Sequence, residues 1–297
     1  MPGTPVHYRS SEEDSERWLG FPHRRGDIVI STRSKSGTTW VQMICALLVF
    51  QTPRLPAPLA ELSPWLDWLV EPRDEVFARL RAQRHRRFLK THTPLDGLPL
   101  DRRVTYVVVA RQPLDMAVSL YHQGANLDRE RVRRLTGSAA PDRPTRPRPP
   151  VREWLLSWIE DEADPREHLD SLPGVMWHLS DAWRRRDEPH VVLVRYEDLT
   201  ADLEGQMRRL AGLLEITVPD EIWPRLVEAA GFESMRAYAD ELAPDRAGVL
   251  KDRRAFFRQG VTGSGRGLLT DDELARYRRR VERLAPPDLV EWLHQDP

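Results

Sequence analysis

The chain has 297 residues, of which 40% are hydrophobic and 31% charged, and its formal net charge at pH 7 is −1. This length allows a large buried core, as one α/β domain or two small ones. A near-neutral chain has no overall field that would attract nucleic acid or an anionic membrane. The one cysteine, Cys45, excludes an internal disulfide framework and a cysteine-based zinc site.

Residues 1–25 form an N-terminal polar segment that is acidic from Glu12 to Glu16 and lacks the apolar core of a signal peptide. The longest mainly apolar run, residues 41–50, is too short to span a bilayer. We therefore expect a cytoplasmic protein without an integral membrane span.

Residues 27–50 read as a strand, a polar turn and a helix. Residues 28–30 are apolar and β-branched, residues 31–37 are polar, and apolar residues then follow at helical spacing. The helix would direct free N–H groups and its positive dipole end at one spot, which suits an anion. The turn and the first helical residues supply further donors, namely the charge of Lys35, the hydroxyls of Ser36, Thr38 and Thr39, and close backbone approach at Gly37.

This stretch is not a Walker A loop, which needs a glycine five residues before a Gly-Lys-Ser/Thr triplet. Here the order is Lys-Ser-Gly, and Thr32 stands in the place of the first glycine. Phosphate binding is thus indicated without a dedicated Mg²⁺-hydroxyl arrangement.

The run Lys35-Ser36-Gly37-Thr38-Thr39-Trp40 resembles the 5′-phosphosulfate loop of the cytosolic-type sulfotransferases. These enzymes use 3′-phosphoadenosine-5′-phosphosulfate (PAPS) as the sulfuryl donor. The resemblance, to a bacterial member of the family, implies that residues 35–39 bind the 5′-phosphosulfate and that Trp40 lies beside the adenine.

Residues 52–73 are rich in proline and tryptophan, so long regular structure is not expected. Either this loop folds over an apolar cavity or its tryptophans pack at an ordinary sheet edge. A charged, helix-like stretch follows at residues 74–87.

A strand is expected over residues 87–91, with Lys90 near its end and His92 just after it. In open parallel sheets, ligands bind outside the carboxyl ends of the strands. The Lys-Thr-His-x-Pro pattern is similar to the family segment that carries the catalytic base. The resemblance implies that His92 takes the proton of the acceptor and that Lys90 steadies the transferring group.

The next strand, residues 104–110, ends at Arg111, and Pro113 suits the first turn of a helix. Ser119 follows in that helix, so the two side chains, arginine and serine, can converge on one anion. This segment resembles the family's 3′-phosphate element, Arg-x-Pro-x-Asp-x-x-Val-Ser.

Residues 131–152 are rich in arginine and proline and are expected to form a flexible surface loop. A nucleic-acid or membrane patch is conceivable, but aromatic residues are absent, which favours a solvated insertion. Residues 153–189 are expected to be helical, with tryptophans in the core.

A further buried strand is expected at residues 190–199, ending in Tyr-Glu-Asp-Leu. Helices are expected near residues 202–214 and 219–230. The segment from Tyr196 and the Gly-Phe-x-x-Met around Phe232 resemble family elements that enclose the adenine.

The last motif, residues 256–266, is a degraded form of the family's Arg-Lys-Gly-x-x-Gly-Asp-Trp-Lys. Arg258, Gly260 and Gly263 match, whereas Gln259 replaces the lysine. The glycines would let backbone N–H groups form an anion nest around the 3′-phosphate. Because one charge and the anchoring tryptophan are lost, we expect a weaker grip or a more mobile segment.

Together these features predict one α/β domain over residues 1–297, with a mainly parallel sheet flanked by helices and a P-loop-like strand–loop–helix. The resemblance implies a PAPS-dependent sulfotransferase that acts on a hydroxyl, or an amine, of a small-molecule or lipid-linked acceptor, such as an alcohol, phenol or glycolipid. It implies no metal and no nucleic-acid partner. A small-molecule kinase and a non-catalytic module that binds PAPS, or its product 3′-phosphoadenosine-5′-phosphate (PAP), are the alternatives. Oligomeric state stays open.

Overall fold

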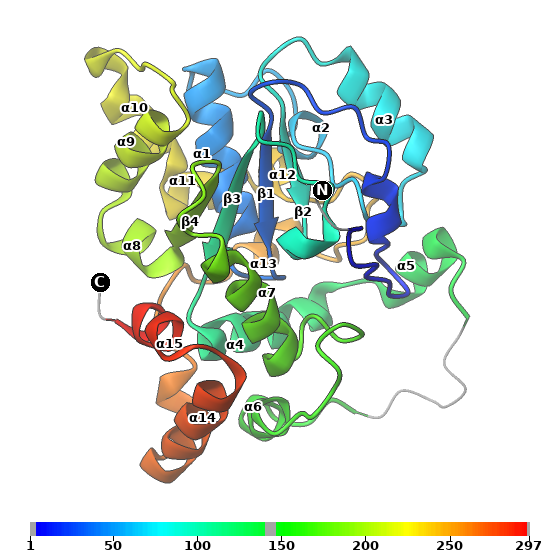
Figure 1. Cartoon of the computed structure of the whole chain (residues 1–297), viewed down its shortest axis with the longest axis vertical. Coiled ribbons are helices and arrows are strands. Elements are labelled where there is room, and N and C mark those ends of the chain that lie inside the picture. The colour runs from blue at the N-terminus through cyan, green and yellow to red at the C-terminus, as the bar shows by residue number, and fades with distance from the viewer. Residues whose placement is uncertain (1–3, 140–146, 296–297) are drawn as a thin grey trace.

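A four-stranded parallel sheet in the order β2-β1-β3-β4 forms the centre of the computed structural model, which describes residues 4–139 and 147–295 (Figure 1). The strands are β1 (Ile28–Thr32), β2 (Phe88–Thr91), β3 (Thr105–Ala110) and β4 (Val191–Arg195). β1 pairs with β2 and β3, and β3 pairs with β4, all in parallel register. The predicted fold class is therefore correct, and each predicted strand is present.

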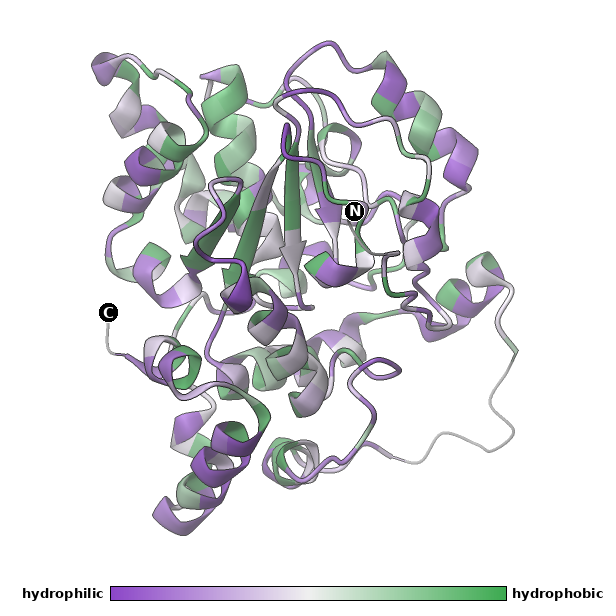
Figure 2. Ribbon diagram, viewed as in Figure 1, coloured by the Kyte–Doolittle hydropathy of each residue, from purple (hydrophilic) through white to green (hydrophobic). Residues whose placement is uncertain are grey.

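The strands are apolar along their length because helices cover both faces of the sheet. Alternate residues face two separate cores: Val29, Leu89, Tyr106 and Val108 lie in one, and Ile28, Ile30, Phe88 and Val107 lie in the other. Figure 2 shows the sheet and α1 as the most uniformly hydrophobic parts of the fold.

Helices α4, α6, α7, α14 and α15 pack on the first core, and α1 and α9 to α12 pack on the second. The helices are α1 (Thr38–Phe50), α2 (Leu59–Leu62), α3 (Arg73–Ala82), α4 (Pro113–Asn126), α5 (Arg129–Thr136), α6 (Val151–Ile159), α7 (Leu172–Arg184), α8 (Tyr196–Ala201), α9 (Leu203–Leu213), α10 (Trp223–Ala230), α11 (Phe232–Ala237), α12 (Ala239–Leu242), α13 (Arg253–Phe256), α14 (Asp271–Leu284) and α15 (Pro287–His294), with 3₁₀ turns η1 (Ser15–Trp18), η2 (Leu95–Gly97), η3 (Asp220–Ile222) and η4 (Arg266–Leu268). Within the described ranges, none of these helices is long and apolar enough to cross a membrane.

Three predicted segments differ from the structure. The strand expected over 190–199 ends at Arg195, and Tyr196 begins the short helix α8. The expected helix over 153–189 is two helices, α6 and α7, and the second starts where the Ser171 hydroxyl accepts a hydrogen bond from the Gly174 N–H (3.1 Å). The expected loop over 131–152 begins instead inside α5, whose Asp128 cap and buried Val132 hold it in place. Residues 140–146 of that loop lie outside the described residues.

The N-terminal segment, polar in composition, is packed onto the body of the protein. Tyr8 and Trp18 are buried. The Tyr8 hydroxyl donates to the Asp96 carboxylate (2.8 Å) and accepts from the Trp177 indole N–H (2.8 Å). These bonds hold residues 8–13 close to the carboxyl-end side of the sheet, where they line the cavity described below.

A buried ion pair joins the residues that directly precede β1 and β2. Asp27 and Arg87 are each 1% exposed, and the Arg87 Nε donates to Asp27 Oδ1 (2.9 Å). Arg87→Met should destabilise the protein by roughly 3–5 kcal/mol, because it leaves a buried carboxylate without its partner. Urea unfolding will measure the change.

The control is Arg103→Met, which breaks the exposed pair with Asp101. Exposed pairs contribute little to stability, so this variant should unfold close to wild type. Equal effects of the two substitutions would contradict the assignment of the Asp27–Arg87 pair as a stabilising element.

Candidate active site

Each of the four strands ends next to a residue that the sequence singles out. Lys35 lies in the turn after β1, His92 directly follows β2, Arg111 follows β3 and Tyr196 follows β4. Because the sheet is parallel, these ends meet at one edge, at the point where the strand order reverses between β1 and β3.

A cavity of about 440 Å³ opens at this edge. Its wall contains nearly all of the predicted site residues, namely Lys35, Gly37, Thr38, Thr39, Trp40, Lys90, His92, Arg111, Ser119, Tyr196, Phe232, Arg258, Gln259 and Gly260. Ser36 is the exception: it is buried within the turn and does not line the cavity.

The turn after β1 has an unusual backbone. Lys35 has φ 65° and Gly37 has φ 104°, both in the left-handed region, which is costly for a lysine and frequent at functional sites. A Cβ on Gly37 would lie 2.9 Å from the Tyr196 ring. No described side chain caps the N-terminus of α1. Its first N–H groups are thus open to an anion.

Lys35 and Lys90 carry charges that no described carboxylate neutralises at ion-pair distance. Their Nζ atoms lie instead over aromatic rings, 3.7 Å from the Phe256 centroid and 3.6 Å from the Trp65 centroid. Burial, reinforced by neighbouring cations, lowers the pKa of Lys35 to about 7. Burial likewise lowers the pKa of Lys90 to about 8. An anion with several negative charges would compensate both lysines.

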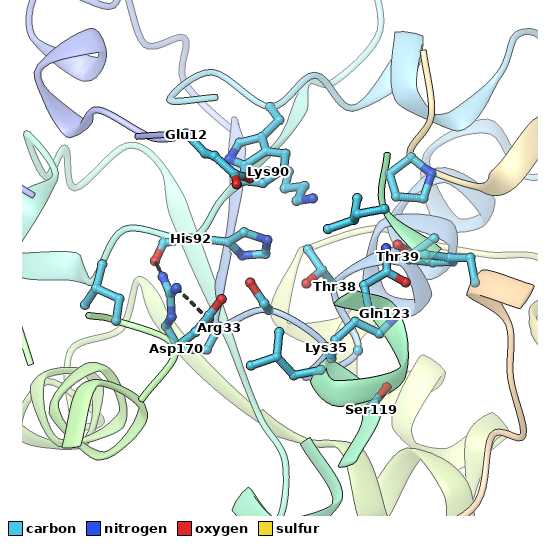
Figure 3. Close-up of a pocket in the computed structure, with 18 of the residues that line it drawn as sticks. Glu12, Arg33, Lys35, Thr38, Thr39, Lys90, His92, Ser119, Gln123 and Asp170 are labelled. Carbon is cyan, nitrogen blue, oxygen red and sulfur yellow. Dashed lines mark hydrogen bonds and ion pairs between the residues drawn. The ribbon is translucent and has the colours of Figure 1, made fainter. Parts of the chain in front are cut away.

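The imidazole of His92 is held as a proton acceptor. Its Nδ1 lies 2.6 Å from the carbonyl oxygen of Thr32, which can only accept, so Nδ1 carries the proton and Nε2 has the free lone pair. Burial, then Lys90 and Arg33, hold the pKa of His92 well below its usual range, so the ring is neutral. His92 and Lys90 point into the same space, across from Thr38 and Thr39 (Figure 3).

Sequence reasoning missed two residues that position His92. The Arg33 guanidinium donates to the His92 carbonyl and pairs with Asp170 Oδ1 at 2.7 Å (Figure 3). Asp67, fully buried, accepts from the hydroxyls of both neighbours of His92, Thr91 (2.5 Å) and Thr93 (2.6 Å). Arg33 lies in the polar turn just before Lys35, which was a signal for it. Asp67 lies in the proline- and tryptophan-rich segment 52–73, and no motif connects it with His92.

The other half of the cavity combines cations and aromatic rings. Arg111 donates to the carbonyls of Lys35 (3.0 Å) and Val261 (3.2 Å), and its guanidinium lies 4.1 Å from the Tyr196 ring centroid. Trp40 packs edge-on against Tyr196 at 5.1 Å. This half suits a ring system that carries phosphate.

The degraded last motif differs from expectation. The N–H groups of Gly263 (2.6 Å) and Gly265 (2.7 Å) donate to the carboxylate of Asp115 in α4, so they are not free to bind phosphate. Gly260 remains in the cavity wall, where a Cβ would lie 2.4 Å from the Phe232 ring. The predicted nest is therefore wrong for Gly263, and Asp115 anchors the segment in place of the missing tryptophan.

The open question about residues 52–73 is also answered. Trp65 and Trp68 stack at 4.8 Å and line the cavity, so this loop folds over it.

One group of described residues, His7, Asp14 and Glu16, brings possible metal-ligand atoms close enough together to hold an ion. It does not contribute to the cavity wall.

At the strand ends of this parallel α/β sheet lie lysines, arginines, a neutral histidine and aromatic side chains. This combination is typical of a nucleotide-dependent group-transfer enzyme of the P-loop-like kind. The model of the sulfotransferase domain family matches residues 25–295. The chain belongs to this family.

Similar proteins agree with this assignment. The chain is 41% identical to a glycolipid sulfotransferase of Mycobacterium tuberculosis, over 98% of this chain and 94% of that protein. It is 24% identical to the luciferin sulfotransferase of Photinus pyralis, over 92% and 74% of the two chains. A mouse sulfotransferase complexed with PAP has a similar fold, with a TM-score of 0.66 at 19% identity over 93% and 91% of the chains. The predicted family, fold and PAPS-dependent sulfotransferase activity are confirmed at the level of the family, and the kinase alternative is not favoured.

The contact between Arg33 and His92 generates the second prediction. Arg33→Met should raise the pKa of His92 toward its usual range, because it removes a positive charge that disfavours the imidazolium. The imidazole shifts of His92 followed against pH by NMR will report the change.

Arg33→Lys keeps the charge and is the matched variant. Its His92 should titrate closer to wild type than that of Arg33→Met. An unchanged His92 titration in Arg33→Met would show that burial and Lys90, without Arg33, set the protonation state of this histidine.

Proposed function

We propose that this protein transfers a sulfuryl group from PAPS to a hydroxyl of a glycolipid acceptor, with His92 as the base. The observation that carries the proposal is the meeting of two unpaired lysines, Lys35 and Lys90, with a histidine whose Nε2 is free, in one cavity. The lysines supply charge for an anionic donor, and the histidine supplies a proton acceptor.

The donor would lie across the strand ends. Its 5′-phosphosulfate would bind the start of α1 together with Lys35, Thr38 and Thr39. Its 3′-phosphate would bind Arg111 and Ser119, with Arg258 and Gly260 close by. Trp40, Tyr196 and Phe232 would enclose the adenine, and Gln259 would line the same end of the cavity.

The transfer is an in-line displacement, comparable with phosphoryl transfer. As the acceptor oxygen bonds to sulfur, its proton passes to His92 Nε2. The sulfur–oxygen bond to the 5′-phosphate breaks, and its electron pair stays on that phosphate oxygen, where Lys35 stabilises the growing charge. Lys90 stabilises the equatorial oxygens of the transferring group.

The acceptor class rests on the relatives at 41% identity, which are named glycolipid sulfotransferases. The acceptor would enter the half of the cavity formed by Trp65, Trp68 and residues 8–13 and 166–170. A cytoplasmic location, predicted above from the polar composition of residues 1–25, is also part of the proposal.

The direct test is incubation of the purified protein with PAPS and glycolipids in mixed micelles, with PAP measured by chromatography. We expect PAP formation that depends on the glycolipid. Lys35→Ala should reduce kcat by roughly 10²–10³, as for loss of one donor to a developing oxyanion. PAP release that ignores the acceptor, or turnover with ATP and Mg²⁺ instead, would refute the proposal.

The third prediction concerns the 3′-phosphate. Arg111→Ala should weaken PAP binding by about 1.5–3 kcal/mol, the usual contribution of a hydrogen bond to a charged group. Adenosine-5′-phosphate, which lacks the 3′-phosphate, should bind the variant and wild type alike. Isothermal titration calorimetry with both nucleotides measures this, and an equal loss for both would place Arg111 elsewhere.

The fourth prediction concerns the base. His92→Gln keeps a polar side chain but loses basicity, so kcat for an alcohol acceptor should fall by about 10²–10⁴. PAP affinity should change little, because the imidazole faces the acceptor. A variant that keeps most of its turnover with every acceptor would show that the proton leaves by another route.

A further inference from the structure

Glu12, Glu13, Glu167 and Asp170 line the acceptor side of the cavity, and Asp67 is buried close to Lys90. Glu167 is exposed, and three of the other four carboxylates are already engaged. The engaged three are Glu12, which pairs with Arg129 (2.9 Å), Asp170, which pairs with Arg33 (2.7 Å), and Asp67, which accepts from Thr91 and Thr93. The fourth, Glu13, receives no hydrogen bond or ion pair at its carboxylate from any residue in the described ranges.

The backbone of Glu13 is nevertheless fixed. Its N–H donates to the Ser10 hydroxyl (3.0 Å), its carbonyl accepts from the Ser10 N–H (2.9 Å), and it forms a β-bridge with Trp68. Glu13 therefore presents its side chain to the cavity from a rigid turn, beside the tryptophan wall.

The surroundings of Glu13 are unfavourable for a lone carboxylate. Burial raises the pKa of Glu13 to about 8. The nearby carboxylates of Asp67 and Asp170 also raise it, whereas the positive charges of Arg33 and Lys90 lower it. An acceptor that fills the cavity would remove the remaining solvent. A carboxyl group that is covered without a hydrogen-bond partner is unfavourable, so the bound acceptor itself has to supply the hydrogen bond.

We propose that Glu13 binds a second hydroxyl of the acceptor while His92 faces the reacting one. The site would thereby select a polyhydroxy acceptor, such as a sugar headgroup, over an alcohol or phenol with one hydroxyl. This inference rests on the proposed function, because it assumes that the acceptor occupies the half of the cavity next to His92. Glu13 would be a residue for specificity and not for proton transfer.

The test compares two probes that share one aromatic group, p-nitrophenyl β-D-glucopyranoside and p-nitrophenol. Their dissociation constants are measured by titration of the protein saturated with PAP. Glu13→Ala should weaken binding of the glucoside tenfold or more and change binding of p-nitrophenol less than twofold. Glu13→Gln keeps an oxygen in the same place and should stay within about threefold of wild type.

Glu16→Ala is the matched control, since this carboxylate is exposed on the same segment and does not line the cavity. It should leave both constants unchanged. Thermal unfolding of each variant separates lost binding from lost structure, and Glu13→Gln carries the comparison if Glu13→Ala fails to fold.

Equal weakening of both probes would overturn the inference, because Glu13 would then act through Lys90 or through the shape of the cavity. An unchanged glucoside constant in Glu13→Ala, or no glucoside binding by wild type, would overturn it as well. The measurement needs no sulfuryl transfer. If only the proposed function were wrong, no PAP would form in the activity assay, but Glu13→Ala would still weaken binding of the glucoside and not of p-nitrophenol.

Discussion

The site depends on buried positive charge that the protein leaves without a partner. Lys35 and Lys90 lie over aromatic rings, and no carboxylate of the described residues lies within ion-pair distance of either lysine. Burial lowers the pKa of each. Such a cluster is unfavourable in the empty protein. The cluster becomes favourable when a donor with several negative charges binds. The lysines then also stabilise the negative charge that develops on the leaving oxygen during transfer.

The positions of the reacting groups follow from the sheet. Parallel pairing brings the ends of β1 and β2 together, so the Thr32 carbonyl can fix the tautomer of His92 (2.6 Å). Arg33 and Asp67 then hold the peptide on either side of this histidine. Because Arg33 and Asp67 are themselves buried, these contacts fix the geometry of the base from packed parts of the fold.

The sequence predicted the parts of the site whose residues are close together in the chain. A strand, a turn with Lys35 and an apolar helix are neighbours in the chain, and Arg111 and Ser119 lie on one strand–helix unit, so spacing alone indicated their convergence. It could not show that Asp115 takes the N–H groups of Gly263 and Gly265, because those partners are some 150 positions apart. Helix α5 was missed because its arginines suggested a solvated loop, whereas Asp128 caps it and Val132 anchors it.

The two halves of the cavity also differ in whether their residues are close together or far apart in the chain. The donor half is built from contiguous motifs, which is why a family resemblance identifies it. The acceptor half is assembled from distant segments: residues 8–13, the tryptophan loop and residues 166–170. Contacts such as the Glu13–Trp68 bridge and the Arg33–Asp170 pair exist only in the folded chain. Donor chemistry can therefore be carried over between relatives, whereas acceptor choice has to be argued from the side chains that this fold brings together.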